Sequence, residues 1–340
     1  MQKPRRPTLQ DVASLVGVTK MTVSRYLRNR NRVAKVTGER IQIALDELGY
    51  IPNRVPDILS NRASRTLGVV LPSLKHPVFQ QVIEGIEKSA AVSGYEVMVA
   101  HSGFEAESEE MRIQTLLSFN VDGLILAESE HSERTLKMIE TAGIPYVDIL
   151  DAEEGEHRAR VGIDNELAAL SMVSLMIERG YKKIICLSAK KGIQTQSKVQ
   201  GYIMAMEEAG FEPKSLSAKS EVSVSLAKKM TRKVLDRYPE TDAFFCTDDE
   251  LAAGVLLECQ NLNISIPDEI GIAGVHALDI GQSLMPRLAS IITPDRETGE
   301  KAVLSLLAML QGETLKSEPL EFELDEGETL LQVNDDLSMF

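Results

Sequence analysis

The side chains best suited to chemistry lie in a short basic segment near the N-terminus, TKMTVSRYL. Arg25 could pair with a guanine through two parallel hydrogen bonds, and Lys20 could donate to a guanine or a phosphate. Met21 could contact the methyl group of a thymine. Two hydroxyl groups suited to phosphate oxygens come from Thr22 and Ser24. These are side chains with which proteins read a DNA duplex, so the segment predicts a DNA contact.

Two short helices joined by a tight turn would position this segment. Thr8 can cap the first helix, with Asp11 as the returning partner of a capping box, and Gly17 can end it in a left-handed conformation. Thr19 can cap the second helix. Such a pair is the helix-turn-helix unit, whose second helix enters the major groove with its N-terminus leading. A third helix is expected to start at Thr37, which we include in the DNA-contacting set.

Charge is distributed unevenly along the chain. The 340 residues include 37 Lys and Arg against 51 Asp and Glu, yet residues 1–65 hold 13 basic residues against 5 acidic ones. A basic N-terminal fifth joined to an acidic remainder is typical of a DNA-binding head on a separate body. The alternative is a three-helix core whose surface is basic without binding DNA.

Residues 50–65, YIPNRVPDILSNRASR, are polar and interrupted by prolines, and they predict a connection. We place the head at residues 1–54 and a hinge helix or linker at 55–65. Pro56 stands at a favourable first position for a short helix that includes Leu59. Because so short a helix is marginal in water, it could form only when two copies pack together on DNA, with an apolar side chain in the minor groove. The alternative is a flexible tether.

From residue 66 to residue 340, apolar strand-like runs alternate with amphipathic helices. The runs cover 67–73, 95–102, 122–129, 145–150, 182–189, 242–249 and 270–275. Strands that alternate with helices predict parallel sheets covered on both faces. The expected fold class is therefore α/β, with two doubly wound parallel-sheet lobes that divide near Asp164 and an all-α helix-turn-helix head.

Polar side chains occupy the positions where these strands end. In a doubly wound fold, ligands bind beyond the carboxyl ends of the strands. Two lobes that face each other across such ends would form a cleft lined with hydrogen-bonding groups, which suits a polyhydroxylated ligand. The residues at these ends are Ser73, His101, Glu128, Asp148, Asp248 and His276.

Sequence motifs for catalysis and nucleotide binding are lacking. The chain has no GxGxxG after a strand, no GxxxxGK[ST], no HExxH and no GxSxG. Asp248 and Asp249 are adjacent carboxylates, but neighbours at a strand end point to opposite faces, which favours a helix cap plus one cleft residue over an acid–base pair. The histidines lack metal-ligand spacing. We therefore expect no enzyme, no metal and no other cofactor.

Cysteine usage and hydropathy indicate a cytoplasmic protein. Cys186, Cys246 and Cys259 occupy apolar runs, and an odd number without CxxC spacing argues against a disulfide framework or a zinc site. We interpret them as core residues. No run reaches the roughly 18 apolar residues that a membrane span needs, and no apolar stretch follows the basic N-terminus as it would in a secretory signal.

The segment GVTKMTVSRYL, followed by LDELGYIPN, strongly resembles the LacI family of bacterial repressors. The similarity continues through LGVVLPS, HPVFQQVIEGIE, VDGLIL, CTDDELAAG and PRLASIITP, and so covers nearly the whole chain. Within the family the chain looks most like the repressors of gluconate utilisation, because of ALDELGYIPNRVPDILSN, FCTDDELAAG and AGVHALDIGQ.

This resemblance implies a periplasmic-binding-protein-like body and a homodimer whose heads read a palindromic operator. It implies that lobe 1 covers about residues 66–164 and 294–321, and that lobe 2 covers about 165–293 and 322–340. A bound ligand would close or rotate the lobes and so move the hinge segments on DNA. Whether ligand releases or promotes DNA binding stays open.

The same resemblance assigns roles on DNA. Lys20, Met21 and Arg25 occupy the base-reading positions, and Leu59 occupies the position of the minor-groove wedge.

Two positions depart from the usual family pattern, and both bear on the ligand. Lys198 stands in KVQGY where most members have arginine, and His276 stands in AGVHALD where most have aspartate. An aspartate would repel an anion, whereas a histidine that donates or becomes charged would accept one. We therefore expect an effector with a carboxylate or phosphate, with gluconate or a close relative as first choice. The alternative is a solvated Lys198 and a core His276.

Phe79 could supply the apolar ring face that sugars need, with core packing as the alternative. The expected effector-binding set is Ser73, Phe79, Glu128, Asp148, Lys198, Asp248 and His276.

Two other classes of protein fit the sequence less well, and two other kinds of regulator fit it equally well. A ligand carrier would not need the head, and nothing in the cleft supports a sugar-modifying enzyme. A regulator of another sugar, or a catabolite regulator that recognises a phosphoprotein, would share these sequence features.

Overall fold

The computed structural model describes residues 5–52, 63–128, 130–152, 159–189, 192–317 and 319–332. The predicted hinge helix and its Leu59 lie outside these residues. The chain divides into two compact units, Met1–Ser64 and Arg65–Phe340, called the head and the body below. Among the described residues, no helix is both long enough and apolar enough to cross a membrane.

The head begins with the two helices that the capping pattern predicts. They are α1 (Leu9–Val16) and α2 (Lys20–Arg28). The backbone N–H groups of Thr8 and Asp11 each bond to the other residue's side chain, which completes the capping box. Gly17, with φ of 74°, ends α1 in the left-handed conformation that glycine adopts without strain. The side chain of Thr19 caps α2.

A short turn, η1 (Arg30–Arg32), leads to α3 (Lys35–Leu48). The third helix therefore begins two residues before Thr37, and its N-cap position holds Ala34, which has no side-chain hydrogen bond to offer. In the core of the head, Tyr26 is more deeply buried than Leu27. The Tyr26 ring packs on Gly38, where any larger residue would press against it.

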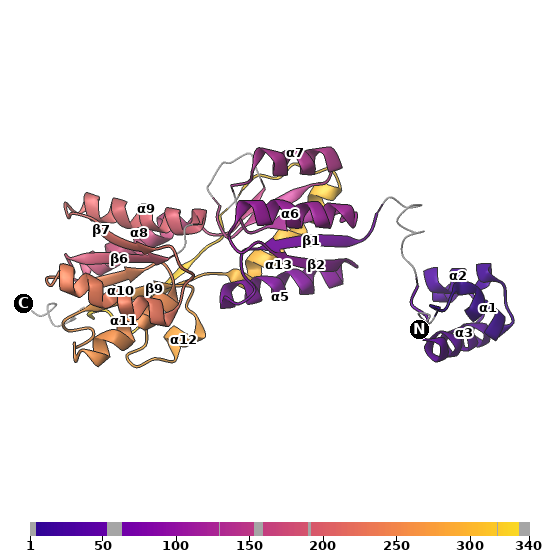
Figure 1. The fold of residues 1–340 in the computed structure, drawn as a ribbon, viewed down its shortest axis with the longest axis horizontal. Coiled ribbons are helices and arrows are strands. Elements are labelled where there is room, and N and C mark those ends of the chain that lie inside the picture. Colours follow the sequence, from indigo (N-terminus) through magenta and orange to yellow (C-terminus); the bar gives the residue numbers. More distant parts are fainter. Residues whose placement is uncertain are drawn as a thin grey trace, which may run out of the picture. The chain divides into compact units, whose positions relative to one another are not determined.

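Two sheets organise the body, each within one lobe (Figure 1). The sheet of lobe 1 has the order β2-β1-β3-β4-β5, with all neighbours parallel. Its strands are β1 (Thr66–Leu71), β2 (Glu96–His101), β3 (Gly123–Leu126), β4 (Tyr146–Ile149) and β5 (Arg160–Val161). Its helices are α5 (Pro77–Val92), α6 (Ala106–Ser118) and α7 (Glu133–Ala142).

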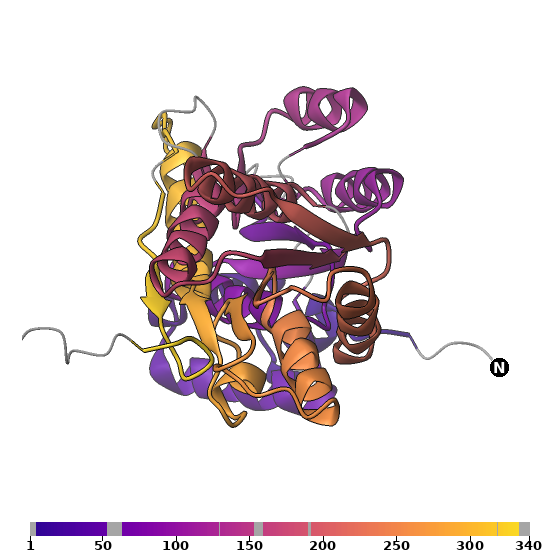
Figure 2. The ribbon, with the colours of Figure 1, turned by 90° about the vertical axis from the view of Figure 1, so that its left-hand side faces the viewer.

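The sheet of lobe 2 has the order β11-β10-β9-β8-β6-β7, with all neighbours parallel except the antiparallel pair β10 and β11. Its strands are β6 (Ile184–Ala189), β7 (Lys214–Ala218), β8 (Ala243–Cys246), β9 (Gly271–Val275), β10 (Ala289–Ile292) and β11 (Glu323–Asp325). Its helices are α8 (Asn165–Glu178), α9 (Ile193–Glu208), α10 (Val224–Arg237), α11 (Asp249–Asn261) and α12 (Asp279–Gln282). Helices flank both faces of each sheet (Figures 1 and 2). The predicted fold class is confirmed.

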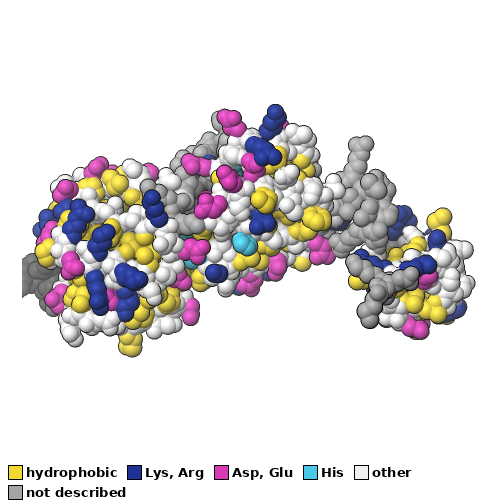
Figure 3. All heavy atoms as spheres, viewed as in Figure 1, with side chains coloured by type: hydrophobic (Ala, Val, Ile, Leu, Met, Phe, Trp, Pro, Cys, Tyr) yellow, Lys and Arg dark blue, Asp and Glu magenta, His cyan; other side chains and the backbone are white. Residues whose placement is uncertain are grey.

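The core of each lobe is built from the apolar strands and the inward faces of these helices. The three cysteines are free and buried in lobe 2, which confirms their interpretation as core residues. The surface of the body mixes acidic, basic and apolar side chains on the face seen in Figure 3.

After β10 the chain passes from lobe 2 to lobe 1 at Thr293–Pro294, where α13 (Asp295–Leu310) begins. Helix α13 packs against α5, and two glycines allow their backbones to touch. A Cβ on Gly85 would lie 2.1 Å from the carbonyl oxygen of Arg296, and one on Gly299 would lie 2.2 Å from the carbonyl oxygen of Val82. Only glycine fits at either position.

We predict that Gly85→Ala destabilises the body, because the added methyl group must push α5 and α13 apart. Overpacking of this kind typically costs about 1–3 kcal/mol. Denaturant unfolding followed by circular dichroism would measure the loss. Gly192→Ala is the matched control, because its Cβ would meet nothing closer than 3.6 Å. Equal stability of the two variants would contradict the close contact between the helices.

Candidate functional site

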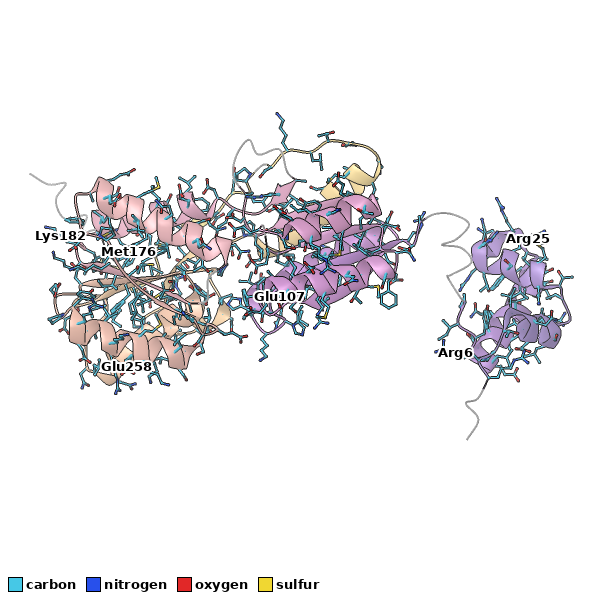
Figure 4. All side chains as sticks on the ribbon, turned by 45° about the horizontal axis from the view of Figure 1, so that its top comes forward. Arg6, Arg25, Glu107, Met176, Lys182 and Glu258 are labelled. Carbon is cyan, nitrogen blue, oxygen red and sulfur yellow. The ribbon has the colours of Figure 1, made fainter. Side chains whose placement is uncertain are left out.

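The predicted DNA-reading residues lie together on the outer side of α2. Val23 and Tyr26 face the core of the head, while Lys20 and Arg25 are exposed and the Met21 side chain is 69% exposed. Figure 4 shows Arg25 on the surface of this helix. A protruding helix with an exposed guanidinium, ammonium and thioether has the form of a major-groove reader.

The three hydroxyl-bearing residues of the set are less exposed. Thr22 and Ser24 are half-buried on α2, and the Thr22 hydroxyl lies 2.9 Å from that of Thr19. Thr37 is half-buried in the first turn of α3. Short side chains held close to the backbone suit phosphate contacts, which need proximity more than reach.

A cavity of about 340 Å³ in the body is lined by residues of both lobes. Its size falls in the range of small-molecule sites. Five residues of the predicted effector set line it, and they come from the ends of three strands and from two helices. They are Ser73, Phe79, Lys198, Asp248 and His276.

Lys198 lies deep in this cavity on α9, with only 4% of its surface exposed. Its Nζ is 3.0 Å from Nε2 of His276 and 3.4 Å from the carbonyl oxygen of Thr247. Neither acceptor is a carboxylate. Burial lowers the pKa of Lys198, an effect that the charges of Asp248 and Asp295 oppose. Among the described residues the ammonium group thus has no bonded counter-ion although it is desolvated, which leaves it able to bind an anion.

A charge on His276, which we expected only as a conditional one, is disfavoured by its surroundings. Burial, followed by the nearby positive charge of Lys198, holds the pKa of His276 well below its ordinary value. The neutral imidazole accepts from Lys198 at Nε2, and its Nδ1 lies 3.0 Å from the hydroxyl of Thr293. His276 therefore orients Lys198 and does not add a second cation to the unliganded cavity.

A second basic side chain in the lining is His76, which precedes α5 in lobe 1. Its Nε2 lies 2.8 Å from Oδ2 of Asp248, the N-cap residue of α11 in lobe 2, so the pair spans the two lobes. Burial works against a charge on His76, but Asp248 outweighs it, and the pKa of His76 is raised. Gln194 makes a further link between the lobes, from its amide nitrogen to the carbonyl oxygen of Ala127 at 3.0 Å.

His76, Asp248 and Glu250 also offer one potential metal-ligand atom each, and these atoms lie within 4.8 Å of one another. The imidazole and the carboxylate already neutralise each other in this arrangement. The adjacent ammonium group of Lys198 further opposes a dication. The cluster is therefore better explained as an ion pair between lobes than as a metal centre.

Two predicted effector residues lie elsewhere. Asp148, on β4, is fully buried and lies 3.0 Å from Nε2 of His131, whose Nδ1 is 3.1 Å from Glu109. It stabilises lobe 1 and does not line the cavity. Glu128 follows β3 and faces Gly192 at the start of α9, also outside the lining. Glu128 follows its parallel strand and Asp148 lies near the end of another, but a strand end alone does not specify which side chains reach the cleft.

Other lining residues were not predicted from the sequence. His76 stands in the HPVF motif, directly before the proline that starts a helix, and this position could have revealed it. Gln194 and Thr195 precede Lys198 by one helical turn, so they share its face. The remaining polar lining residues follow β7, a strand that was not predicted, or adjoin Asp248. They include Glu221, Ser223, Thr247 and Glu250.

The helix-turn-helix head and the two-lobed body with an internal cavity define a ligand-responsive DNA-binding regulator. Two family descriptions match the chain. Residues 8–53 match the bacterial regulatory proteins of the lacI family. Residues 64–321 match the periplasmic binding proteins and sugar binding domain of the LacI family. The chain belongs to the LacI family of DNA-binding transcriptional regulators.

Individual relatives agree with this assignment. The HTH-type transcriptional regulator GntR of Escherichia coli K12 is 47% identical over 327 residues, covering 96% of this chain and 99% of the relative. IdnR of the same organism is 40% identical, covering 90% and 92%. A LacI-family regulator from Silicibacter pomeroyi, 31% identical, superposes with a TM-score of 0.88 over 96% of this chain and 100% of its own. These relatives are regulators and share the fold over nearly their whole length.

The His131 cluster generates a prediction of pH dependence. Burial opposes the charge, but Asp148 and Glu109 raise the pKa of His131 from 6.5 to about 9. A raised pKa in the folded state stabilises the protein fully below about pH 6.5, and this contribution is lost as pH rises through 9. The melting temperature should therefore fall between pH 7 and 9.5, and less steeply in His131→Gln. His101→Gln, on an exposed residue, should follow the native profile. Parallel profiles for all three proteins would refute the assignment.

Proposed function

We propose that this regulator is a repressor whose affinity for its operator is controlled by a sugar acid, with gluconate as the effector and genes of gluconate uptake and catabolism as its targets. The observation that carries the proposal is the Lys198 ammonium, which is buried in the cavity and, within the described part of the chain, bonded only to uncharged acceptors. A carboxylate is the ligand group that best compensates such a charge. The 47% identity with GntR supports gluconate in particular.

The rest of the cavity suits a polyhydroxylated chain attached to that carboxylate. Asp248 and Glu250 can accept hydrogen bonds from hydroxyl groups, and Thr195 can donate or accept them. Phe79 offers an apolar ring on the lobe 1 side. The ammonium group of Lys198 and the acceptors near it can thus contact the carboxylate and the hydroxyl groups of one linear sugar acid.

DNA is proposed to be bound by Lys20, Met21 and Arg25 as base readers and by Thr22, Ser24 and Thr37 on phosphates. We further propose that the protein acts in the cytoplasm as a homodimer on a palindromic operator. Exposed apolar side chains on the body support pairing of two copies, notably Val92 and Met285, which are 88% and 81% exposed. Matching of two heads to two half-sites follows from such two-fold symmetry.

Lys198→Met should abolish the response to gluconate while leaving operator binding intact. The side chain keeps its length but loses its charge, and a lost charged hydrogen bond of about 1.5–3 kcal/mol lowers affinity about 10- to 150-fold. Fluorescence anisotropy of a labelled operator palindrome, titrated with gluconate at fixed salt, gives the readout. Lys75→Met is the control, because Lys75 also lines the cavity but is exposed.

In the same assay, 6-phosphogluconate and ribose test the ligand class. Release by a sugar acid alone supports the proposal. Release by neutral ribose, or an unchanged gluconate response in Lys198→Met, would rule out the assigned role of the ammonium group.

Arg25→Ala should weaken binding of the cognate operator and relax preference at one base pair, because a bidentate contact to guanine contributes about 1–3 kcal/mol of discrimination. Operators with single substitutions, compared in the same anisotropy assay, would locate that base pair. Lys229→Ala, an exposed basic residue of α10 in the body, should change nothing. If Arg25→Ala weakens every duplex equally, Arg25 contacts phosphate and does not read a base.

A further inference from the structure

A chain of polar contacts leads from the cavity to the crossover between the lobes. Nζ of Lys198 lies 3.0 Å from Nε2 of His276, and Nδ1 of His276 lies 3.0 Å from the Thr293 hydroxyl. Beyond it, Oδ2 of Asp295 lies 4.0 Å from Nδ1 of His276. The imidazole is thus placed between a cation that faces the ligand and a carboxylate that begins α13, the helix that packs in lobe 1.

The backbone at His276 is held in an uncommon conformation. His276 has φ of 95° and Ala277 has φ of 46°, two successive left-handed residues that are not glycine. Such positions cost energy and concentrate at functional sites. The bend turns the imidazole from the end of β9 toward Thr293, and it is anchored by a hydrogen bond from the Ala277 N–H to the side chain of Ser290.

Asp295 is a buried carboxyl group with spare hydrogen-bonding capacity. The residue is 3% exposed, and within the described part of the chain no donor reaches its Oδ2. Burial raises the pKa of Asp295 to about 7. A buried carboxyl group with an oxygen that lacks a donor is strongly stabilised in its ionised form by a new positive charge beside it.

Resting on the proposed sugar-acid effector, we propose that His276 and Asp295 relay its binding to the lobe crossover. The carboxylate of the ligand binds the ammonium group of Lys198, so Nε2 of His276 loses its hydrogen bond from Nζ. Nε2 then takes up one proton from solution, and the resulting imidazolium pairs with the carboxylate of Asp295. Anion binding in lobe 2 thereby creates an attraction toward the first residue of the lobe 1 helix α13.

The proton balance follows from the groups around the imidazole. In the unliganded protein Nε2 accepts from Lys198, so the ring proton is on Nδ1. Lys198 on α9, His76 before α5 and Asp295 on α13 are the titratable groups that face His276. His76 is paired with Asp248, which raises the pKa of His76, and the relay assigns the new proton to His276. Above pH 7 the proton gained by Nε2 is a net uptake from solvent; below pH 7 Asp295 starts protonated and loses its proton to solvent when it pairs with the imidazolium, so loss and gain cancel.

Calorimetric titration of the native protein with gluconate in buffers of different ionisation enthalpy measures proton uptake. We expect about 0.5–1 proton per protomer at pH 7.5 and close to zero at pH 6. His276→Asn should bind gluconate without uptake, and asparagine tolerates a positive φ, which preserves the bend. Asp295→Asn, of equal size, should also lose the uptake while binding within about threefold of native affinity.

Two further variants test whether the proton belongs to His276. His101→Gln, on an exposed residue, should leave uptake unchanged. His76→Gln should retain uptake, and its loss there would assign the proton to His76 and overturn the relay. Gluconate binding by the native protein with no uptake at pH 7.5 would overturn the relay and leave the proposed effector standing. An absence of gluconate binding would overturn both.

Release of the operator provides a second readout. The gluconate concentration at which Asp295→Asn releases the operator should be at least about tenfold higher than the concentration expected from its own affinity for gluconate. A coupling free energy of about 1–3 kcal/mol is typical of such regulators. Release by Asp295→Asn at the native gluconate concentration would show that the coupling bypasses Asp295.

Discussion

The arrangement of the body depends on a desolvated ammonium group placed between two lobes. Lys198 loses the hydration of its charge on folding, and it bonds to an imidazole and a carbonyl oxygen. Its compensation comes from carboxylates at longer range, chiefly Asp248 and Asp295. Such a group is tolerated in a binding protein because a ligand can supply the missing negative charge. Burial, followed by the charge of Lys198, keeps the pKa of His276 low, whereas Asp248 raises the pKa of His76 against the opposing charge of Lys198.

The head meets a different physical requirement, because its stability comes from local capping and a small core. The Thr8 capping box, the left-handed Gly17 and the Tyr26 ring on Gly38 fix the helices. A guanidinium group from α3 adds a bond to the last turn of α1, from Arg40 to the carbonyl oxygen of Val16 at 2.6 Å. The residues on the outer side of α2 are therefore not needed for the core of the head, and they are available to contact DNA.

Much of this architecture was predictable because it rests on local signals. The capping residues specified α1 and α2, and the apolar runs marked β1 to β4, β6, β8 and β9, whereas β5, β10 and β11 were not among the predicted runs. The strand β7, KSLSA, was missed because its polar residues alternate as in a half-buried edge strand. Asp148 was predicted to bind the effector, although in the structure it faces His131, because only tertiary contacts decide the direction of its side chain. The charge of the two histidines depended on neighbours from other elements, His76 beside Asp248 and His276 beside Lys198, and sequence spacing carries no such information.

The glycine contact between α5 and α13 has a mechanical consequence. Backbone packed directly on backbone leaves no side-chain layer that could shear, so the two helices must translate as a single block. Asp295 at the start of α13 and His76 at the N-terminus of α5 then belong to the same block and move together. A displacement of a few tenths of an ångström at that end of the block is transmitted along α13 over its 16 residues, roughly 24 Å, without being absorbed.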